Sequence, residues 1–373
     1  MSRNTSIRIL QVGLSANSGG IESFAVNYQM ALRPYNVVFD YVSMDDYLAY
    51  EDVIQKAGGC IYRLPNVKRH PIRFARAFYC LVKKYDVVHI NMLSDANILP
   101  VIVSRLAKNK KTIIHSHNTD TEGRIRHILH TINKPIVSQL NLTRLACGHE
   151  AAKWLYTDSV VQQAGYEVLH NAVNLQKYSF HEVTRNKIRS ELCVAEDTVL
   201  LGVVGRLSRE KNLLFMLGVM AKIVPNSKRV VLVHVGPVTD TRYEQLVRNK
   251  IVEMHLEPYV KLLGCKDNVE QYYSAMDVYC MPSLYEGLSF TAIEAQVSGV
   301  RCLFSDTMSL ETKITENVKF LPLNQDVWSN VLLTCRHDNH QKRNLENLGI
   351  IGGNYDIKAQ ARELMRIYEV EDV

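Results

Sequence analysis

Two carboxylates, Glu286 and Glu294, stand with seven residues between them near the C-terminal third of the chain. The apolar run Val278 to Met281 predicts a buried parallel strand before them, and Ser289 or Thr291 offers an N-cap for the helix that follows. Glu286 would then lie in a loop and Glu294 in the first helical turn. Ligands of open α/β sheets bind at such loops, outside the carboxyl ends of the strands. These residues therefore favour a site for a polyol or a phosphate.

Each carboxylate also has a simpler interpretation. Thr291 and Glu294 have the Ser/Thr-x-x-Glu spacing of a capping box, in which Glu294 would accept a hydrogen bond from the Thr291 backbone N–H. Glu286 could be a solvated loop charge. The spacing of the two residues leaves both alternatives open.

A basic loop follows another predicted strand, Val199 to Val204, and contains Arg206 and Lys211. Cations near a helix N-terminus oppose the helix macrodipole at about 0.3 to 1 kcal/mol each, which suggests an anion between them. Arginine supplies a bidentate fork for phosphate and lysine a point charge, so a diphosphate is a sensible ligand. The alternative is a basic loop that is merely solvated.

Two adjacent glycines, Gly19 and Gly20, follow the first predicted strand, Ile7 to Val12, and precede a helix expected from about Ile21. Glycines at this place let a backbone approach closely, and a helix N-terminus attracts phosphate. The spacing is not G-x-G-x-x-G, so a dinucleotide fingerprint is not satisfied. The glycines could equally serve the turn itself.

Two histidines, His115 and His117, stand at the end of the predicted strand Thr112 to His115. No third ligand with metal-site spacing accompanies them, so we favour a polar contact to a substrate over a metal site. We expect the two rings to point to opposite faces, with one of them toward a cleft. A structural histidine that bonds a neighbouring loop is the alternative.

The chain has 373 residues, 47% of them hydrophobic and 22% charged, and a net charge of +6. This length predicts roughly two domains of 150 to 200 residues. The charge is compatible with an anionic ligand or membrane surface, but dense basic runs with aromatics, typical of nucleic-acid binders, are missing. Eight scattered cysteines without a C-x-x-C pair predict reduced, mostly buried thiols in a cytoplasmic protein. We expect neither a signal peptide nor a membrane span, so any membrane contact would be peripheral.

Short β-rich runs alternate with helical stretches, which predicts an α/β fold of parallel sheets built by right-handed crossovers. The polar segment Asn174 to Asp197 is the expected linker between two Rossmann-like domains that face a central cleft. We expect an N-terminal domain over 1–173, a C-terminal domain over 174–354 and a final segment over 355–373, helical from Ile357 to Tyr368. The other predicted strands are Val37 to Val42, Cys60 to Leu64, Val87 to Ile90, Arg144 to Ala146, Tyr166 to Leu169, Arg229 to Val235, Val260 to Leu262 and Arg301 to Phe304.

These motifs, in chain order, resemble those of the GT-B retaining glycosyltransferases of family 4, particularly those that assemble bacterial capsular polysaccharide or exopolysaccharide. The resemblance covers nearly the whole chain. It implies a nucleotide diphosphate sugar bound mainly on the C-terminal domain, an acceptor mainly on the N-terminal one, and a final helix that crosses back to the first domain. The motifs are Gly19-Gly20 with Glu22, His117-Asn118, Gly205-Arg206 with Lys211-Asn212, and Glu286 with Glu294.

The resemblance also implies roles for single residues. Arg206 and Lys211 would hold the diphosphate, and Glu294 would accept hydrogen bonds from the ribose hydroxyls. His117 would lie near the sugar carbon that is transferred. Glu286 would grip the donor sugar hydroxyls and phosphate together with the backbone of Gly287, Leu288 and Ser289. Gly19 and Gly20 would let the N-terminal domain approach the diphosphate.

Departures from the family pattern concern the hinge and the sugar site. His170 to Asn174 stand where many relatives carry Asn-Gly-Ile-Asp, and Ser289 replaces a frequent proline. An Asp-x-Asp metal motif in a fitting loop is missing from the sequence, so we expect neither metal nor cofactor. His117, Glu286, Arg206 and Lys211 form the predicted catalytic set, with the two cations stabilising the leaving diphosphate.

The functional hypothesis is transfer of a hexose or N-acetylhexosamine from a UDP-sugar to a lipid-linked saccharide. Alternatives are a UDP-sugar epimerase of related fold or a non-catalytic nucleotide-sugar-binding partner. We expect a cytoplasmic location with peripheral contact at an anionic membrane, through a basic amphipathic helix. Its alternative is a solvated helix face. The helix would contain Arg124, Arg126, His127, His130 and Lys134, interleaved with Ile125, Ile128, Leu129 and Ile132.

Overall fold

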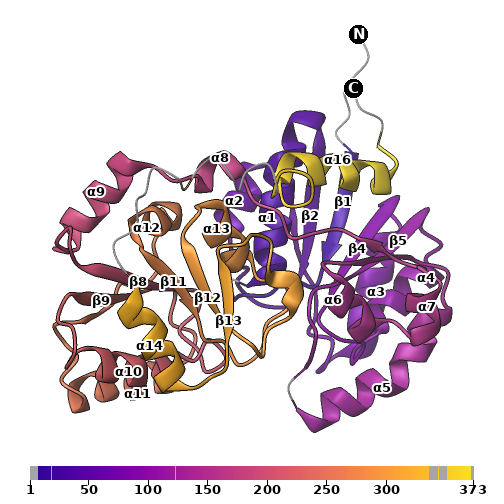
Figure 1. Cartoon of the computed structure of the whole chain (residues 1–373). Coiled ribbons are helices and arrows are strands. Elements are labelled where there is room, and N and C mark those ends of the chain that lie inside the picture. Colours follow the sequence, from indigo (N-terminus) through magenta and orange to yellow (C-terminus); the bar gives the residue numbers. More distant parts are fainter. Residues whose placement is uncertain (1–6, 18, 122, 336–342, 344–350, 371–373) are drawn as a thin grey trace. The chain divides into compact units, whose positions relative to one another are not determined.

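The computed structural model describes residues 7–17, 19–121, 123–335, 343 and 351–370. The chain forms two compact units, one of residues 1–172 with 357–373 and the other of residues 173–356. Each unit is a parallel sheet flanked by helices (Figure 1). The α/β fold expected from the alternating pattern is confirmed.

In the first unit, described strands pair in the order β3-β2-β1-β4-β5-β6-β7. The chain runs outward from β1 to β3, then returns to place β4 on the other side of β1. This reversal is a topological switch point, where loops at the carboxyl ends of β1 and β4 diverge and leave room for a ligand. The strands are β1 (Ile7–Val12), β2 (Val37–Ser43), β3 (Ile61–Arg63), β4 (Val87–Met92), β5 (Lys111–Ser116), β6 (Thr143–Ala146) and β7 (Glu167–Val168).

The last helix of the described residues, α16 (Ile357–Tyr368), belongs to the first unit. The Tyr368 hydroxyl forms hydrogen bonds with the side chains of Gln11 in β1 and His89 in β4. Lys111 Nζ donates to the Ile367 carbonyl at the end of the helix over 2.6 Å. A lysine at a helix C-terminus satisfies carbonyls that lack an intrahelical partner. The other helices are α1 (Gly20–Leu32), α2 (Glu51–Lys56), α3 (Pro71–Val82), α4 (Leu99–Leu106), α5 (Arg124–Gln139), α6 (His149–Leu155) and α7 (Asp158–Gln162).

In the second unit, strands pair in the order β10-β9-β8-β11-β12-β13, and the switch point falls between β8 and β11. The helix α10 is apolar on most of its surface and packs into the core with Trp328 and Leu332. The strands are β8 (Val199–Val204), β9 (Val230–Val235), β10 (Val260–Leu262), β11 (Val278–Met281), β12 (Arg301–Ser305) and β13 (Val318–Leu321). The helices are α8 (Leu175–Tyr178), α9 (Glu182–Glu191), α10 (Leu213–Ile223), α11 (Thr241–Glu253), α12 (Val269–Ala275), α13 (Phe290–Val297) and α14 (Gln325–Thr334).

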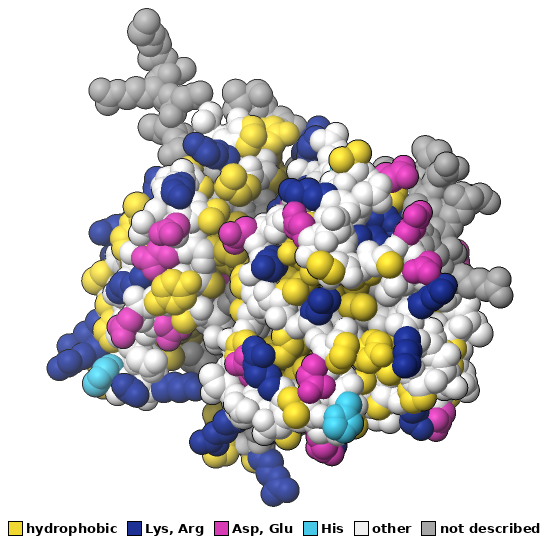
Figure 2. Space-filling view, turned by 90° about the vertical axis from the view of Figure 1, so that its left-hand side faces the viewer, with side chains coloured by type: hydrophobic (Ala, Val, Ile, Leu, Met, Phe, Trp, Pro, Cys, Tyr) yellow, Lys and Arg dark blue, Asp and Glu magenta, His cyan; other side chains and the backbone are white. Residues whose placement is uncertain are grey.

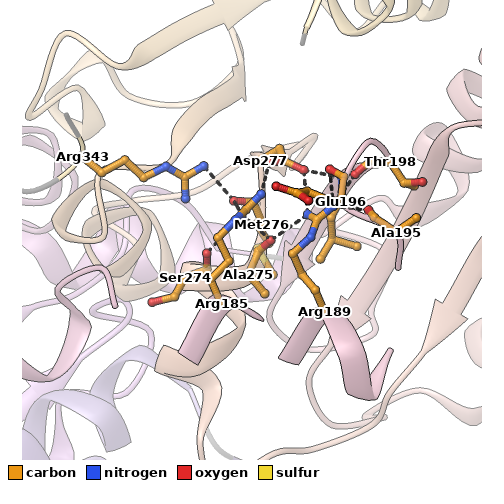
Figure 3. Close-up of polar contacts among 11 residues, drawn as sticks. Arg185, Arg189, Ala195, Glu196, Thr198, Ser274, Ala275, Met276, Asp277 and Arg343 are labelled. Carbon is orange, nitrogen blue, oxygen red and sulfur yellow. Dashed lines mark hydrogen bonds and ion pairs between the residues drawn. The ribbon is translucent and has the colours of Figure 1, made fainter. Parts of the chain in front are cut away.

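The segment Asn174 to Asp197, expected to be a polar linker, contains α8 and α9 and packs onto the second unit. Figure 3 shows the reason: Arg185 and Arg189 of α9 both pair with the buried carboxylate of Asp277, over 2.6 and 3.0 Å. Arg185 also donates to backbone carbonyls at the end of α12. These polar residues are buried because they pair with an opposite charge, and a hydropathy pattern cannot distinguish such a segment from an exposed linker.

Two further expectations differ from the structure. Strand β13 was not among the predicted strands, because Val318–Leu321 is short and carries an exposed lysine. The cysteines were expected to be mostly buried, but Cys60, Cys80, Cys193 and Cys265 are exposed. All eight cysteines are free thiols, as the sequence predicts.

Candidate functional site

The loops after β8 and β11 meet at the switch point of the second unit. Lys211, in the β8 loop, is buried and forms an ion pair with Glu286 in the β11 loop. The Leu284 N–H donates to the Glu210 carbonyl over 2.8 Å, and Asn212 Nδ2 donates to the Pro282 carbonyl over 3.1 Å. These cross-links fix the two loops against each other, so Lys211 and Glu286 have defined positions.

Arg206 occupies the same loop as Lys211 but has a different surrounding. Its Nη2 donates to Glu210 over 3.0 Å, and about a third of the side chain is exposed. A partly exposed ion pair of this kind contributes little to stability, so the guanidinium can exchange Glu210 for an anionic ligand at low cost. Arg206 and Lys211 thus combine a solvent-facing fork with a buried point charge.

Gly205 permits the close approach of Lys211. Its φ of +140° is rarely adopted by residues with a side chain, and a Cβ there would lie 3.2 Å from Lys211 Cε. The opposing Gly236 is equally constrained, since a Cβ there would lie 1.8 Å from the Gly205 carbonyl oxygen. Gly205 is therefore favoured by its backbone conformation, and Gly236 is required by packing at the carboxyl ends of β8 and β9.

Glu294 is not a helix cap. The helix α13 begins at Phe290 with Ser289 as its N-cap residue, so Glu294 lies in the second turn and the capping-box alternative is wrong. The Thr291 hydroxyl instead accepts from Tyr279, over 3.0 Å. Glu294 Oε2 accepts from the Tyr273 hydroxyl over 2.8 Å. Burial raises the pKa of Glu294 above its usual value, and the Tyr273 and Tyr178 hydroxyls oppose this by hydrogen bonding.

The remaining predicted contacts of the β11 loop differ in exposure. Leu288 is buried, whereas Gly287 and Ser289 are half-buried. The Ser289 hydroxyl lies 3.0 Å from that of Thr291, which places a small polar cluster at the start of α13.

The β1–α1 loop of the first unit is organised by Glu22, a residue the motif contained but to which the sequence assigned no role. Its carboxylate accepts from the Ser15 N–H over 2.8 Å, from the Ser15 hydroxyl, and from the Gly19 N–H over 3.1 Å. Burial raises its pKa, and these hydrogen bonds oppose the rise. Glutamate three residues after the N-cap Gly19 is a capping-box spacing, which is the signal that could have identified it. Gly20 begins α1, one residue earlier than expected.

His117 lies just beyond β5, where its Nε2 is 2.8 Å from Asn91 Oδ1 of β4. The expectation that His115 and His117 point to opposite faces was wrong, because residues two apart in a strand share a face. Their ring centroids are 4.0 Å apart. Burial lowers the pKa of His117 to about 3, so the ring is neutral near pH 7. Gly13, which follows β1, packs against Asn91, since a Cβ there would lie 2.1 Å from the Asn91 carbonyl oxygen.

The predicted site residues therefore form two sets. Arg206, Lys211 and Glu286 belong to adjoining loops of the second unit, with Glu294 on the following helix. Gly19, Gly20 and His117 belong to the switch-point region of the first unit. Asn91, Glu210 and Tyr273 were missed, because single polar residues in buried strands, loops and helices have no sequence signature. No group of three metal-ligating side chains is present among the described residues.

Comparison with known proteins finds similarity to glycosyltransferases. Residues 198–327 match the family model for "Glycosyl transferases group 1". The "Putative glycosyltransferase EpsF" of Bacillus subtilis (strain 168) is 26% identical over 97% of this chain and 96% of its own length. A UDP-Gal:alpha-D-GlcNAc-diphosphoundecaprenol alpha-1,3-galactosyltransferase of Escherichia coli is 28% identical over 62% of this chain and 60% of its own.

Solved structures show the same fold. Anabaena Alr3699/HepE in complex with UDP and glucose superposes with a TM-score of 0.79, at 17% identity over 97% of this chain and 99% of that one. A glycosyltransferase from Rickettsia africae superposes with a TM-score of 0.81, at 16% identity over 98% of each chain. Sheet order, switch-point loops and these matches agree that the chain has the GT-B fold, and residues 198–327 identify its second unit as a group 1 glycosyltransferase domain.

Proposed function

We propose that this enzyme transfers a hexose or N-acetylhexosamine from a UDP-sugar to a lipid-linked saccharide during synthesis of a cell-surface glycan. The observation that carries the proposal is the pairing of Lys211 with Glu286 across two loops at the switch point. A cation and a carboxylate held side by side suit a ligand with a diphosphate next to a polyol. The names of relatives support this: the HepE crystals contain UDP or UDP-glucose, and the E. coli enzyme is named for UDP-Gal and a diphosphoundecaprenol acceptor.

The proposed division of labour follows from the surroundings of each side chain. Arg206 exchanges Glu210 for phosphate oxygens, and Lys211 neutralises charge that develops on the leaving diphosphate. Glu286 accepts from sugar hydroxyls, and Glu294 accepts from the ribose. Because both ion-pair partners are already fixed in place, little reorganisation accompanies bond breaking.

Retention is proposed to proceed by displacement on one face of the sugar. The bond from the anomeric carbon to the diphosphate oxygen breaks as the acceptor oxygen bonds to that carbon. The departing phosphate oxygen takes the acceptor proton, so no side chain becomes covalently attached. A sugar adduct trapped on any side chain, detected by mass spectrometry of the intact protein, would contradict this route.

The experiment for the donor is a thermal-shift screen of nucleotide sugars. A ligand at 100 times its Kd stabilises a protein by about 2.7 kcal/mol, which is readily detected. We expect one UDP-sugar to raise the Tm more than UDP does. Transfer to a lipid-linked acceptor should then be seen with that donor. Indifference to every nucleotide sugar would contradict the proposal.

We further propose peripheral contact with an anionic membrane through α5. This helix is held to the first unit by one stripe: His130 and Val137 are buried, and Asn133 and Lys134 donate to the carbonyls of Asp95 and Lys153, each over 2.8 Å. His130 therefore does not belong to the exposed basic face where the sequence placed it. Its ring stacks on Trp154, with centroids 4.0 Å apart.

The apolar stripe of α5 faces solvent instead of the core. Its members recur at steps of three or four residues, and Ile125 and Ile132 are 76% and 58% exposed. The whole stripe is Ile125, Ile128, Leu129, Ile132 and Ile136. Residues 123–149 contain no Asp or Glu, whereas on the face in Figure 2 acidic and basic side chains are intermingled. An exposed apolar stripe beside arginines, without carboxylates, fits the interface of an anionic bilayer.

Liposome sedimentation tests this contact. We expect binding to vesicles with anionic lipid, lost when Ile128 and Ile132 are both replaced by Ser. Val183→Ser is the matched control, because Val183 is an exposed apolar residue on another helix. Binding that ignores anionic lipid, or an equal loss in the control, would contradict the contact. No helix in the described part of the chain is long and apolar enough to cross a membrane.

A further inference from the structure

A chain of hydrogen bonds through buried side chains connects His117 with the final helix of the first unit. Asn91 Nδ2 lies 3.0 Å from Gln11 Oε1, and Gln11 Nε2 lies 3.0 Å from the Tyr368 hydroxyl. The Tyr368 hydroxyl also lies 2.7 Å from His89 Nδ1, and His89 Nε2 lies 3.2 Å from His115 Nδ1. Together with the 2.8 Å contact between His117 and Asn91, this chain of hydrogen bonds joins β1, β4, β5 and α16.

The direction of this chain is fixed by a single backbone group. Asn91 Nδ2 also lies 3.1 Å from the carbonyl oxygen of Val12, which can only accept. The amide nitrogen of Asn91 must therefore face Val12, and its Oδ1 must face His117. Since Oδ1 can only accept, the proton of the neutral His117 ring resides on Nε2.

The same reasoning orients the rest of the chain. Asn91 uses its N–H on Gln11, so Gln11 presents Oε1 to it and donates from Nε2 to the Tyr368 hydroxyl. Tyr368 has one proton, which it donates to His89 Nδ1. A neutral His89 then carries its proton on Nε2 and donates to His115 Nδ1. Every donor thus points the same way from His117 through Tyr368 to His115.

Packing holds the rings in this register. Phe24 of α1 presents its edge to His115 and His117, with centroids 4.8 and 5.1 Å away. Burial lowers the pKa of His89 to about 3 and that of His115 well below its usual value, so all three rings are neutral near pH 7. Neutral rings are what a chain with one donor and one acceptor on each ring requires.

We propose that Asn91 and Tyr368 are positioning residues that hold the His117 ring in its Nε2–H tautomer, with Tyr368 acting through Gln11. Their catalytic relevance rests on the proposed function and on the role that the family resemblance implies for His117, near the sugar carbon that is transferred. The final helix then has a role beyond packing, because its last residue completes the chain that orients a side chain of the site.

Long-range ¹H–¹⁵N correlation spectra of histidine-labelled protein test the tautomer without any substrate. At pH 7 we expect the signal of His117, assigned by its loss in His117→Asn, to be that of a neutral Nε2–H ring. Asn91→Leu should abolish this single tautomer, and Tyr368→Phe should first disturb His89. A wild-type His117 protonated on Nδ1 would overturn the proposal.

Turnover tests the positioning role. Loss of one buried hydrogen bond predicts that Tyr368→Phe lowers kcat about fivefold, with the KM for the donor nearly unchanged. Tyr156→Phe is the matched control, since its buried hydroxyl donates to the Leu145 carbonyl over 2.6 Å, outside the chain. Equal loss of kcat in both variants would contradict a positioning role for Tyr368 and indicate a structural one. Wild-type kcat in His117→Asn would overturn the role of the chain in catalysis, whereas absence of transfer from every UDP-sugar would overturn the proposed function.

Discussion

Lys211 and Glu286, 75 residues apart in sequence, form an ion pair at the carboxyl ends of neighbouring strands. The sequence assigned them separate partners, a diphosphate and a sugar. Their pairing means that each holds the other in place before a ligand arrives. A donor must then share or separate the pair, so charge on one residue affects what the other can bind.

Glu286→Gln should lower kcat by about 100-fold, because it removes a charged group that acts on the transition state. The amide keeps the shape of the side chain but frees Lys211 from a competing carboxylate. Binding of UDP, measured by calorimetry, should therefore be retained or slightly stronger. Glu210→Gln is the control, because Glu210 pairs with the half-buried Arg206 in the same loops. A parallel loss of UDP affinity and kcat in Glu286→Gln would contradict separate roles.

Glu294→Ala should weaken UDP binding by about 10- to 100-fold, the range for losing a hydrogen bond to a charged group. The comparison is Tyr273→Phe, which removes the hydroxyl that donates to Glu294 but leaves the carboxylate. That variant should lose some stability and keep its UDP affinity within about threefold. If both variants bind UDP equally poorly, Glu294 acts through local structure rather than through the ribose.

Patterns that depend on neighbours in the sequence were predicted well. The strands around both switch points, the loop position of Glu286 and the helix Ile357–Tyr368 follow from apolar runs and breakers. Ser289, one of the two residues predicted as the N-cap of α13, is its N-cap. The partner of Glu294 did not follow from the sequence, because Tyr273 and Glu294 meet only after α12 and α13 pack. The supposed linker failed for the same reason: Arg185 is hydrophilic in sequence yet buried against Asp277. Long-range pairing of polar groups is what local patterns do not contain.

Asp277→Asn is expected to destabilise the second unit by about 3 to 5 kcal/mol, because it leaves two buried guanidinium groups without their counterion. Burial raises the pKa of Asp277, but Arg185, Arg189 and the Leu200 N–H outweigh it and hold the pKa below its usual value. Urea unfolding measures the loss. Asp197→Asn breaks an exposed pair with Arg229 and should change stability by no more than about 0.5 kcal/mol. Similar losses in both variants would contradict the buried network as the cause.

The pH dependence of stability offers a test in which two buried groups act in opposite directions. Burial lowers the pKa of His89 from 6.5 to about 3, so the unfolded chain binds its proton first. Its contribution to stability is complete above pH 6.5 and is lost as the pH falls toward 3, at up to about 1.4 kcal/mol per pH unit. Burial raises the pKa of Asp95 to about 7, so the folded state binds that proton first, and stability from this group increases as the pH falls from 7 toward 4.

Replacing either group should therefore change how steeply the free energy of unfolding depends on pH below pH 7. Between pH 6 and 4, His89→Gln should make the free energy of unfolding fall less steeply with decreasing pH than in the wild type. Asp95→Asn should make it fall more steeply, because the opposing gain is removed. Denaturant unfolding at a series of pH values measures both slopes. Slopes that change in the same direction in the two variants would contradict the assignment of these groups, because neutral replacements of a buried base and a buried acid must alter proton uptake with opposite signs.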